Sequence, residues 1–293
     1  MNEDEARAVA TELYCGILKR EPDAGGLAAY TQALLADGSP RRIVELMREF
    51  ERSGEAATLT AKLRGIFAYE RPSPIGTINH IISLGTDCYG SFLLKLAGWK
   101  RASYPFDWLL SSPPIVVDAL QDDFARFLDP AQHRSIPVHL RRSPNERCAD
   151  HLHYRDRFGI EAIFMHRDIT EKAHLAYYRR TVERFRKVMT SDQTKLLLMT
   201  NTANKHATDE NFAALCEVAD RRYQNTMVLA VNFERAPDDS VTQMGGDLLS
   251  QIGPHQLIRY RATSKLNGMT FSNWIDDVNL RGMLAQYQME LSA

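Results

Sequence analysis

Apolar residues in the first fifth of the chain recur every three or four positions, with polar residues between them. The pattern contains Leu13, Ile17 and Leu18, then Leu27, Tyr30 and Leu34, then Ile43, Leu46, Met47 and Phe50. This spacing is typical of amphipathic helices. Turn residues in "KREPDAGGLAAY" and "DGSPRR" separate the three groups. We therefore predict three short helices between residues 6 and 57.

Two prolines and a glycine interrupt the helical pattern in "RPSPIGT", residues 71–77. A connecting helix over residues 58–70 precedes them. Because this composition favours neither helix nor strand, we place a domain boundary here. The prediction is a helical module over residues 1–70 and a second domain over residues 78–293.

Beyond residue 78, apolar runs of strand length alternate with helical spacings. The predicted strands are "HIISLG" (80–85), "EAIFMH" (161–166), "KLLLMT" (195–200), "TMVLAV" (226–231) and "QLIRYR" (256–261). Helical patterns occur at 91–99 and 115–128, from Leu175 to Phe185, around Phe212, and in a tail from Trp274 to Leu284. This alternation predicts an α/β fold, a mostly parallel sheet with helices on both faces, preceded by a small all-helical domain. Residues 141–159 read as a long polar loop.

Composition excludes several classes of protein. Lys and Arg total 36 against 37 for Asp and Glu, and no basic run contains interleaved aromatics, so we expect no nucleic-acid partner. No apolar run is long enough to span a membrane. The acidic start "MNEDEARAVATELYC" shows no signal peptide, which predicts a cytoplasmic protein. The common Gly-rich phosphate loops are absent, and we expect no cofactor.

The four cysteines are widely spaced and form no C-x-x-C pair, so a disulfide framework is not expected. Cys148, His151 and His153 have metal-ligand chemistry, with Asp150 and Asp156 nearby. They lack a second well-spaced pair of ligands, which favours a solvated loop over a zinc site. We expect no metal.

Polar residues follow several of the predicted strands. Cys88 comes after the first strand, His166 ends the second, and Asn201 and Asn232 follow the next two. Because ligands bind outside the carboxyl ends of parallel strands, we expect these four side chains to converge on one edge of the sheet.

Cys88 stands where a helix should begin, and the positive end of a helix dipole lowers a thiol pKa. The adjacent Asp87 opposes ionisation unless its carboxylate caps the helix. Cys88 is therefore either a nucleophile or a small buried hydrophobe. His166 is the best candidate base, the alternative being a histidine bonded to backbone. Asp168 could orient His166, but "DITE" favours a helix cap with Glu171.

The stretch "SYPFDWLLSSPP", residues 103–114, places Asp107 between Phe106 and Trp108. An isolated carboxylate among such bulky apolar residues is costly unless it is paired. Asp107 could orient His166, bond to backbone N–H groups beneath Cys88, or serve the structure alone. Pro113 fits the first position of the helix that follows.

Three motifs together, "SLGTDC", "SYPFDWLLSS" and "DDFARFLDP", followed by a strand ending at His166, resemble a bacterial family of unknown function described as putative papain-like cysteine peptidases. The similarity covers about residues 78–235. It implies that Cys88 is the nucleophile, His166 the catalytic histidine and Asp107 the acidic residue of the site. Papain-like enzymes place the histidine on an antiparallel sheet, whereas the alternation here is more similar to SGNH-type hydrolases.

The first module resembles a short helical module of unknown function that is distantly similar to phycobilisome-linker repeats. The matching residues are "ILKREPDAGGLAAY" and "LMREFERSGE". This resemblance implies attachment or scaffolding, and hence a possible protein partner.

The leading hypothesis is thiol-dependent acyl transfer on a glycan, peptide or acyl-donor substrate, with Cys88 attacking a carbonyl and His166 relaying the proton. Substrate-binding or oxyanion roles fall to Gly85, Thr86, Asp87, Tyr89, Trp108 and Asn201. The acceptor is either water or a sugar hydroxyl, as in an acyltransferase onto a polysaccharide of the cell surface. The alternative is a non-catalytic glycan- or peptide-binding scaffold in which Cys88 only packs.

Overall fold

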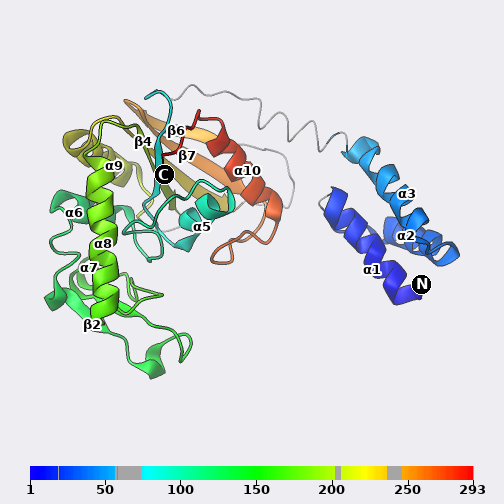
Figure 1. Ribbon diagram of the computed structural model, residues 1–293, viewed down its shortest axis with the longest axis horizontal. Coiled ribbons are helices and arrows are strands. Elements are labelled where there is room, and N and C mark those ends of the chain that lie inside the picture. The colour runs from blue at the N-terminus through cyan, green and yellow to red at the C-terminus, as the bar shows by residue number, and fades with distance from the viewer. Residues whose placement is uncertain (19, 57, 59–73, 202–205, 236–245, 293) are drawn as a thin grey trace. The chain divides into compact units, whose positions relative to one another are not determined.

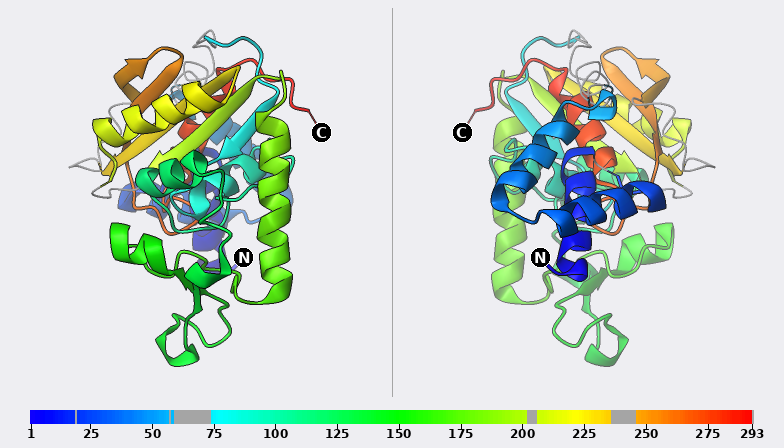
Figure 2. Two further views of the ribbon diagram at one scale, coloured as in Figure 1. Left: turned by 90° about the vertical axis from the view of Figure 1, so that its left-hand side faces the viewer. Right: turned by 90° about the vertical axis from the view of Figure 1, so that its right-hand side faces the viewer.

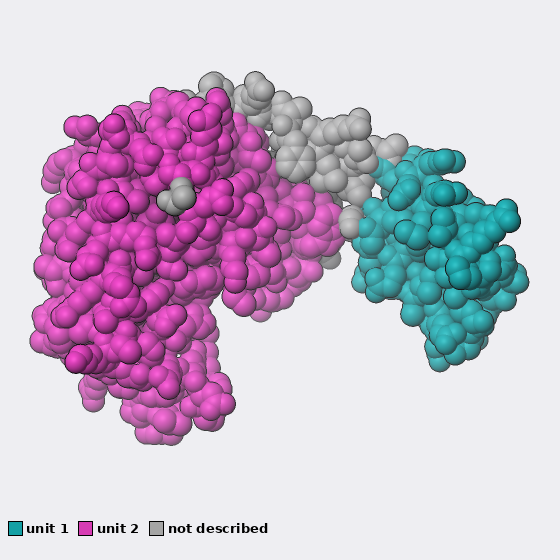
Figure 3. Space-filling view, viewed as in Figure 1, with its two compact units in different colours: residues 1–69 teal, residues 70–293 magenta. Residues whose placement is uncertain are grey.

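The computed structural model describes residues 1–18, 20–56, 58, 74–201, 206–235 and 246–292. The chain divides into two compact units, residues 1–69 and 70–293 (Figure 3). Residues 59–70 of the expected connecting helix and residues 71–73 of the boundary at 71–77 lie outside the described residues.

Unit 1 is helical. It contains α1 (Glu3–Leu13), the π-helical turn η1 (Tyr14–Leu18), α2 (Ala24–Ala36) and α3 (Pro40–Glu51). Side chains of Asn2, Asp23 and Ser39 cap the three α-helices by accepting backbone N–H groups. Apolar residues from each helix pack around Tyr14 and Phe50, whose ring centroids lie 4.9 Å apart. The predicted helices in this region are confirmed.

Unit 2 is built on a five-stranded sheet (Figure 1). Its strands, in spatial order, are β1 (His80–Ser83), β4 (Lys195–Asn201), β5 (Thr226–Arg235), β7 (His255–Ala262) and β6 (Gly246–Ile252). The first four are parallel, and β6 runs antiparallel to β7.

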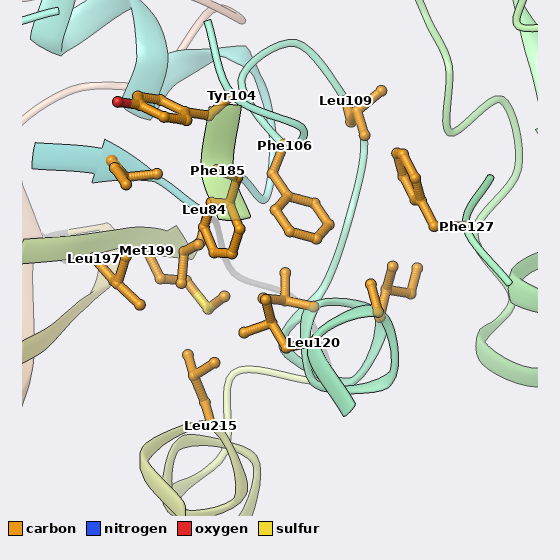
Figure 4. Packing of buried hydrophobic residues seen from close by; sticks show 14 of the residues in the cluster. Leu84, Tyr104, Phe106, Leu109, Leu120, Phe127, Phe185, Leu197, Met199 and Leu215 are labelled. Atoms are coloured by element: carbon orange, nitrogen blue, oxygen red, sulfur yellow. The ribbon is translucent and has the colours of Figure 1, made fainter. Parts of the chain in front are cut away.

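Alternate residues of each strand face opposite layers of helices, because successive side chains in a strand point to opposite faces. One face packs against α6 (Pro113–Gln121), α8 (Lys172–Met189) and α9 (Asp209–Arg222). The other packs against α5 (Cys88–Leu96) and α10 (Trp274–Ala285). Figure 4 shows the first core, where Leu197 and Met199 of β4 meet Leu120 of α6 and Leu215 of α9. The predicted α/β class, with helices on both faces, is confirmed.

A side structure between α6 and α8 projects from unit 2 away from the main sheet (Figure 2). It contains η2 (Pro130–Gln132), β2 (His133–Ser135), η3 (Val138–Leu140), β3 (Ala149–His151) and α7 (Leu152–Phe158), and β2 pairs antiparallel with β3. The prediction of one long loop over 141–159 was therefore wrong. Within this range, β3 has only three residues and α7 only seven, and both are too short to show a clear periodicity in the sequence.

The structure differs from the sequence analysis at three further points. Residues 161–166 form no strand, since only Phe164 pairs, in an isolated bridge with Ala149. The helix expected over 115–128 stops at Gln121, because Asp123 and Phe124 take left-handed φ values of 54° and 61°. Strand β6 was not predicted, because as an edge strand it is mostly exposed and lacks an apolar run.

The turn after β1 is held from both sides. The N–H of Thr86 donates to the carbonyl of Thr200 on β4 at 3.1 Å, and the carbonyl of Thr86 accepts the N–H of Ser111 at 2.8 Å. Gly85 has φ +91°, and a Cβ there would lie 2.3 Å from the Ser111 hydroxyl. Only glycine fits this position, both for its conformation and for its neighbours.

Replacing Gly85 with alanine tests this clamp, with Gly76→Ala as the matched control. Gly76 also has a positive φ, +82°, but a Cβ there meets nothing within 4 Å. We expect the free energy of unfolding to fall by about 3 kcal/mol for Gly85→Ala and about 1 kcal/mol for Gly76→Ala, because only the first adds a clash to the backbone strain. Denaturant unfolding measures both. Equal losses would mean that Ser111 does not confine the turn.

A cysteine and histidine pair beside the end of strand β1

Cys88 is the first residue of α5, as the sequence predicted. Asp87 caps the helix, and its carboxylate accepts the Tyr89 N–H at 2.9 Å. Gly90, whose role the sequence did not reveal, lets α5 pack directly on the sheet: a Cβ there would lie 2.9 Å from the Ser83 hydroxyl and 3.0 Å from that of Thr200. The turn, the cap and the close packing together fix the position of the thiol.

The Cys88 thiol contacts the imidazole of His166, with 3.2 Å between Sγ and Nε2. Cys88 is only 7% exposed, whereas His166 is exposed. The solvent-exposed member of the pair is therefore the histidine. Two residues 78 positions apart in sequence are brought into hydrogen-bonding distance.

The segment that carries His166 is held without being a strand. Phe164 exchanges two backbone hydrogen bonds of 3.1 Å with Ala149, and the Ile163 carbonyl accepts the Leu110 N–H at 3.0 Å. Ile163 and Phe164 are fully buried. Their apolar pattern reflects core packing, which is why the sequence suggested a strand.

The electrostatic surroundings of Cys88 differ from those predicted. Burial, and then the neighbouring Asp87, raise the pKa of the thiol to about 11. Burial also raises the pKa of Asp87 to about 6. The expected lowering of the Cys88 pKa by the helix N-terminus was wrong, because burial and the charge of Asp87 both raise this pKa. At neutral pH the sulfur is a protonated thiol.

Asp168 neither orients His166 nor caps α8, so the predicted cap was wrong. Its carboxylate accepts the Ser135 hydroxyl and both the N–H and hydroxyl of Thr170. The N-cap of α8 is Glu171, without a side-chain cap bond. In the parts of the chain that the structure describes, no carboxylate bonds to His166.

Asp107 is 1% exposed and pairs with the Lys100 ammonium. It also accepts the Tyr104 N–H at 2.7 Å. Burial raises the pKa of its carboxyl, and Lys100 opposes this shift. No hydrogen bond or ion pair links Asp107 to Cys88 or His166 among the described residues. Trp108 is half-buried, and its ring lies 5.8 Å from the Lys100 nitrogen.

Most of the N–H groups expected to hold an oxyanion already have acceptors. Gly85 donates to the Ser83 hydroxyl at 3.4 Å, Thr86 to Thr200 and Tyr89 to Asp87. The Tyr89 side chain is buried, and its hydroxyl donates to Asp277 at 2.9 Å. Among the described residues, the N–H groups of Asp87 and Cys88 have no acceptor, as the first N–H groups of a helix commonly lack one.

Asn201 and Asn232, at adjacent ends of β4 and β5, are brought together. The Asn201 amide donates to Asn232 at 2.7 Å, and Asn232 donates to the Ala207 carbonyl at 3.3 Å. The Asn201 side-chain oxygen is buried without a hydrogen bond. No hydrogen bond joins this pair to Cys88 or His166 in the described chain.

The residues weighed as metal ligands have other roles. Cys148 is 3% exposed, and the buried His151 bonds to the Arg126 carbonyl at 3.0 Å. Burial lowers the pKa of His151 to about 4, which keeps it neutral. Within the described ranges no group of three or more His, Cys, Asp or Glu residues could hold a metal ion.

Unit 2 thus has an α/β fold, in which a cysteine and a histidine are in contact beside the carboxyl edge of the sheet. Residues 79–235 match the family described as "Putative papain-like cysteine peptidase". The match spans more than half of the chain, and the protein belongs to this family. Comparison with curated proteins and with solved structures gave no match. No helix in the described ranges is long and apolar enough to cross a membrane.

Asp107→Asn tests whether this residue anchors the structure. The change leaves Lys100 partly buried without its partner, and breaking a buried ion pair in this way costs about 3–5 kcal/mol. We expect a free energy of unfolding lower by that amount, with much of the loss recovered in Lys100→Met/Asp107→Asn. Denaturant unfolding of the single and double variants gives the coupling. A variant as stable as the parent but chemically inert would instead assign Asp107 to catalysis.

Asp87→Asn tests the charge next to the thiol, because asparagine keeps an oxygen for the Tyr89 N–H. Removing the negative charge lowers the pKa of Cys88, so at pH 8 we expect iodoacetamide to modify Cys88 several times faster than in the parent. Peptide mapping by mass spectrometry between pH 6 and pH 10 measures the shift. Asp209→Asn, an exposed site on α9, is the control. Coincident profiles for all three proteins would rule out an effect of Asp87.

Proposed function

We propose that this protein is a cysteine-dependent acyl-transfer enzyme, with Cys88 as nucleophile and His166 as general base. The observation that carries the proposal is the 3.2 Å contact between Sγ and Nε2. Membership of a family described as peptidases supports a thiol enzyme in general. The choice of acyl transfer rests on the chemistry that such a pair performs.

The first step forms a thioester. His166 Nε2 takes the thiol proton as Cys88 Sγ attacks the carbonyl carbon of an ester, thioester or amide. The Cys88 N–H lies at the start of α5, where it can donate to the oxyanion that develops. His166 then gives the proton to the leaving group, and the acyl group stays on sulfur.

Because burial and Asp87 raise the pKa of Cys88 to about 11, we propose that the proton leaves during attack rather than before it. Papain-type cysteines, by contrast, rest as a thiolate stabilised by histidine. The reaction here is closer to that of a serine hydrolase, in which histidine acts as general base.

The second step transfers the acyl group to an acceptor. Water makes the enzyme a hydrolase, and a sugar hydroxyl makes it an acyltransferase that acts on a polysaccharide. Both acceptors attack the same thioester with His166 as base. The first step is common to both alternatives and is therefore the one to test.

Incubation with activated thioesters and p-nitrophenyl esters should leave an acyl adduct on the peptide that contains Cys88, read by mass spectrometry. We expect Cys88→Ala to abolish the adduct, and His166→Ala to slow its formation by about 10²–10⁴-fold, the usual contribution of a general base. Cys15→Ala and His139→Ala, in unit 1 and in the exposed η3 turn, serve as matched controls.

Adduct formation that is indifferent to His166→Ala would refute a general-base role. If Cys88 forms no adduct with any reagent while the protein remains folded, the protein is instead a binding scaffold in which the cysteine only packs.

A further inference from the structure

Arg167, the residue after His166, has an unusual environment. It is half-buried, and its guanidinium carbon lies 4.1 Å from the centroid of the Tyr177 ring on α8. It makes no hydrogen bond or ion pair within the described residues. Every other half-buried arginine in the described part of the chain has at least one such partner: Arg42, Arg126, Arg141, Arg155, Arg186, Arg259, Arg261 and Arg281.

The acidic side chains that follow Arg167 in sequence are engaged elsewhere. Asp168 binds Ser135 and Thr170. Glu171 pairs with Arg147 at 2.9 Å. Neither carboxylate pairs with Arg167.

A guanidinium has five N–H donors, and partial burial removes some of the water that would satisfy them. Stacking on an aromatic face stabilises the charge but accepts few of these donors. The arrangement holds the side chain in place and leaves its donors for an external acceptor. The acceptor that matches a planar guanidinium is an anion with two oxygens.

The position of Arg167 relates this acceptor to the proposed reaction. Its neighbour His166 contacts Cys88. Arg167 and Cys88 both act on the pKa of the buried Tyr178 hydroxyl, next to the stacked Tyr177: Arg167 lowers that pKa and Cys88 raises it, within a shift dominated by burial. The backbone of Arg167 is thus one residue from the histidine of the proposed site.

We propose that Arg167 binds a carboxylate of the substrate close to the carbonyl that Cys88 attacks. The inference rests on the proposed function and narrows its substrates to acyl compounds with a negative charge near the reacting carbon. One guanidinium balances one negative charge, which suits a carboxylate better than a phosphate dianion. Arg167 acts in binding and specificity, and takes no part in the proton transfer.

Two alkylating reagents test this without knowledge of the substrate. Iodoacetate and iodoacetamide react in the same way: Sγ bonds to the methylene carbon, iodide leaves and the thiol proton is lost. They differ in that only iodoacetate carries a carboxylate. Their rates at Cys88 are measured at pH 9 by peptide mapping. The ratio of the two rates is independent of the thiolate fraction, because both reagents attack the same sulfur.

We expect Arg167→Gln to lower the iodoacetate to iodoacetamide ratio at Cys88 by about tenfold, as loss of a charge-assisted hydrogen bond predicts. Arg179→Gln removes an exposed arginine of α8 and should leave the ratio unchanged. The ratio at Cys15, in unit 1, is an internal reference for all variants. Continued protection of Cys216, which is fully buried, shows that each variant is folded.

A second measurement uses the parent protein alone. Raising the salt concentration to 1 M should slow iodoacetate at Cys88 and leave iodoacetamide unaffected, since salt screens the attraction of the carboxylate. If the iodoacetate to iodoacetamide ratio at Cys88 is unchanged both in Arg167→Gln and at high salt, while iodoacetamide still modifies Cys88, the carboxylate site is refuted and the proposed function stands. If neither reagent modifies Cys88 at pH 9, the proposed function fails and the carboxylate site fails with it.

Discussion

The candidate site depends on how the backbone of Thr86 is held between two neighbours. One side of this residue bonds to Thr200 at the end of β4, and the other bonds to Ser111. The turn that leads into α5 therefore has a single position relative to the sheet. Cys88 is the first residue of α5, so the fixed turn also fixes where its sulfur lies. This position places Sγ within 3.2 Å of His166 Nε2.

Two buried polar contacts keep α5 in place. The Tyr89 hydroxyl bonds to Asp277 on α10, and Asp107 pairs with Lys100 just beyond the end of α5. Asp277 lies outside residues 79–235, the part that matches the family. The C-terminal part of unit 2 therefore supports the nucleophile, although it carries none of the motifs that first suggested one.

The central strands of the sheet could be predicted from the sequence, because β4 and β5 are continuous apolar runs. The position of the cysteine could also be predicted, because Asp87 and Cys88 mark the start of a helix. The contact of Cys88 with His166 was expected for a partly wrong reason, since His166 follows no strand and is held by the burial of Phe164. The raised pKa of Cys88 could not be predicted from the sequence, because it depends on how far the folded chain excludes water from the thiol. Arg167 could not be distinguished either, since an unpaired charge is a property of three-dimensional surroundings.

The central claim is that His166 removes the proton of a thiol that is otherwise protonated at neutral pH. The pH dependence of Cys88 acylation in the parent and in His166→Ala tests it most directly. The account predicts that the parent rate becomes independent of pH well below the thiol pKa of about 11, whereas the variant rate keeps rising toward that pH. Profiles of the same shape in both proteins would contradict it.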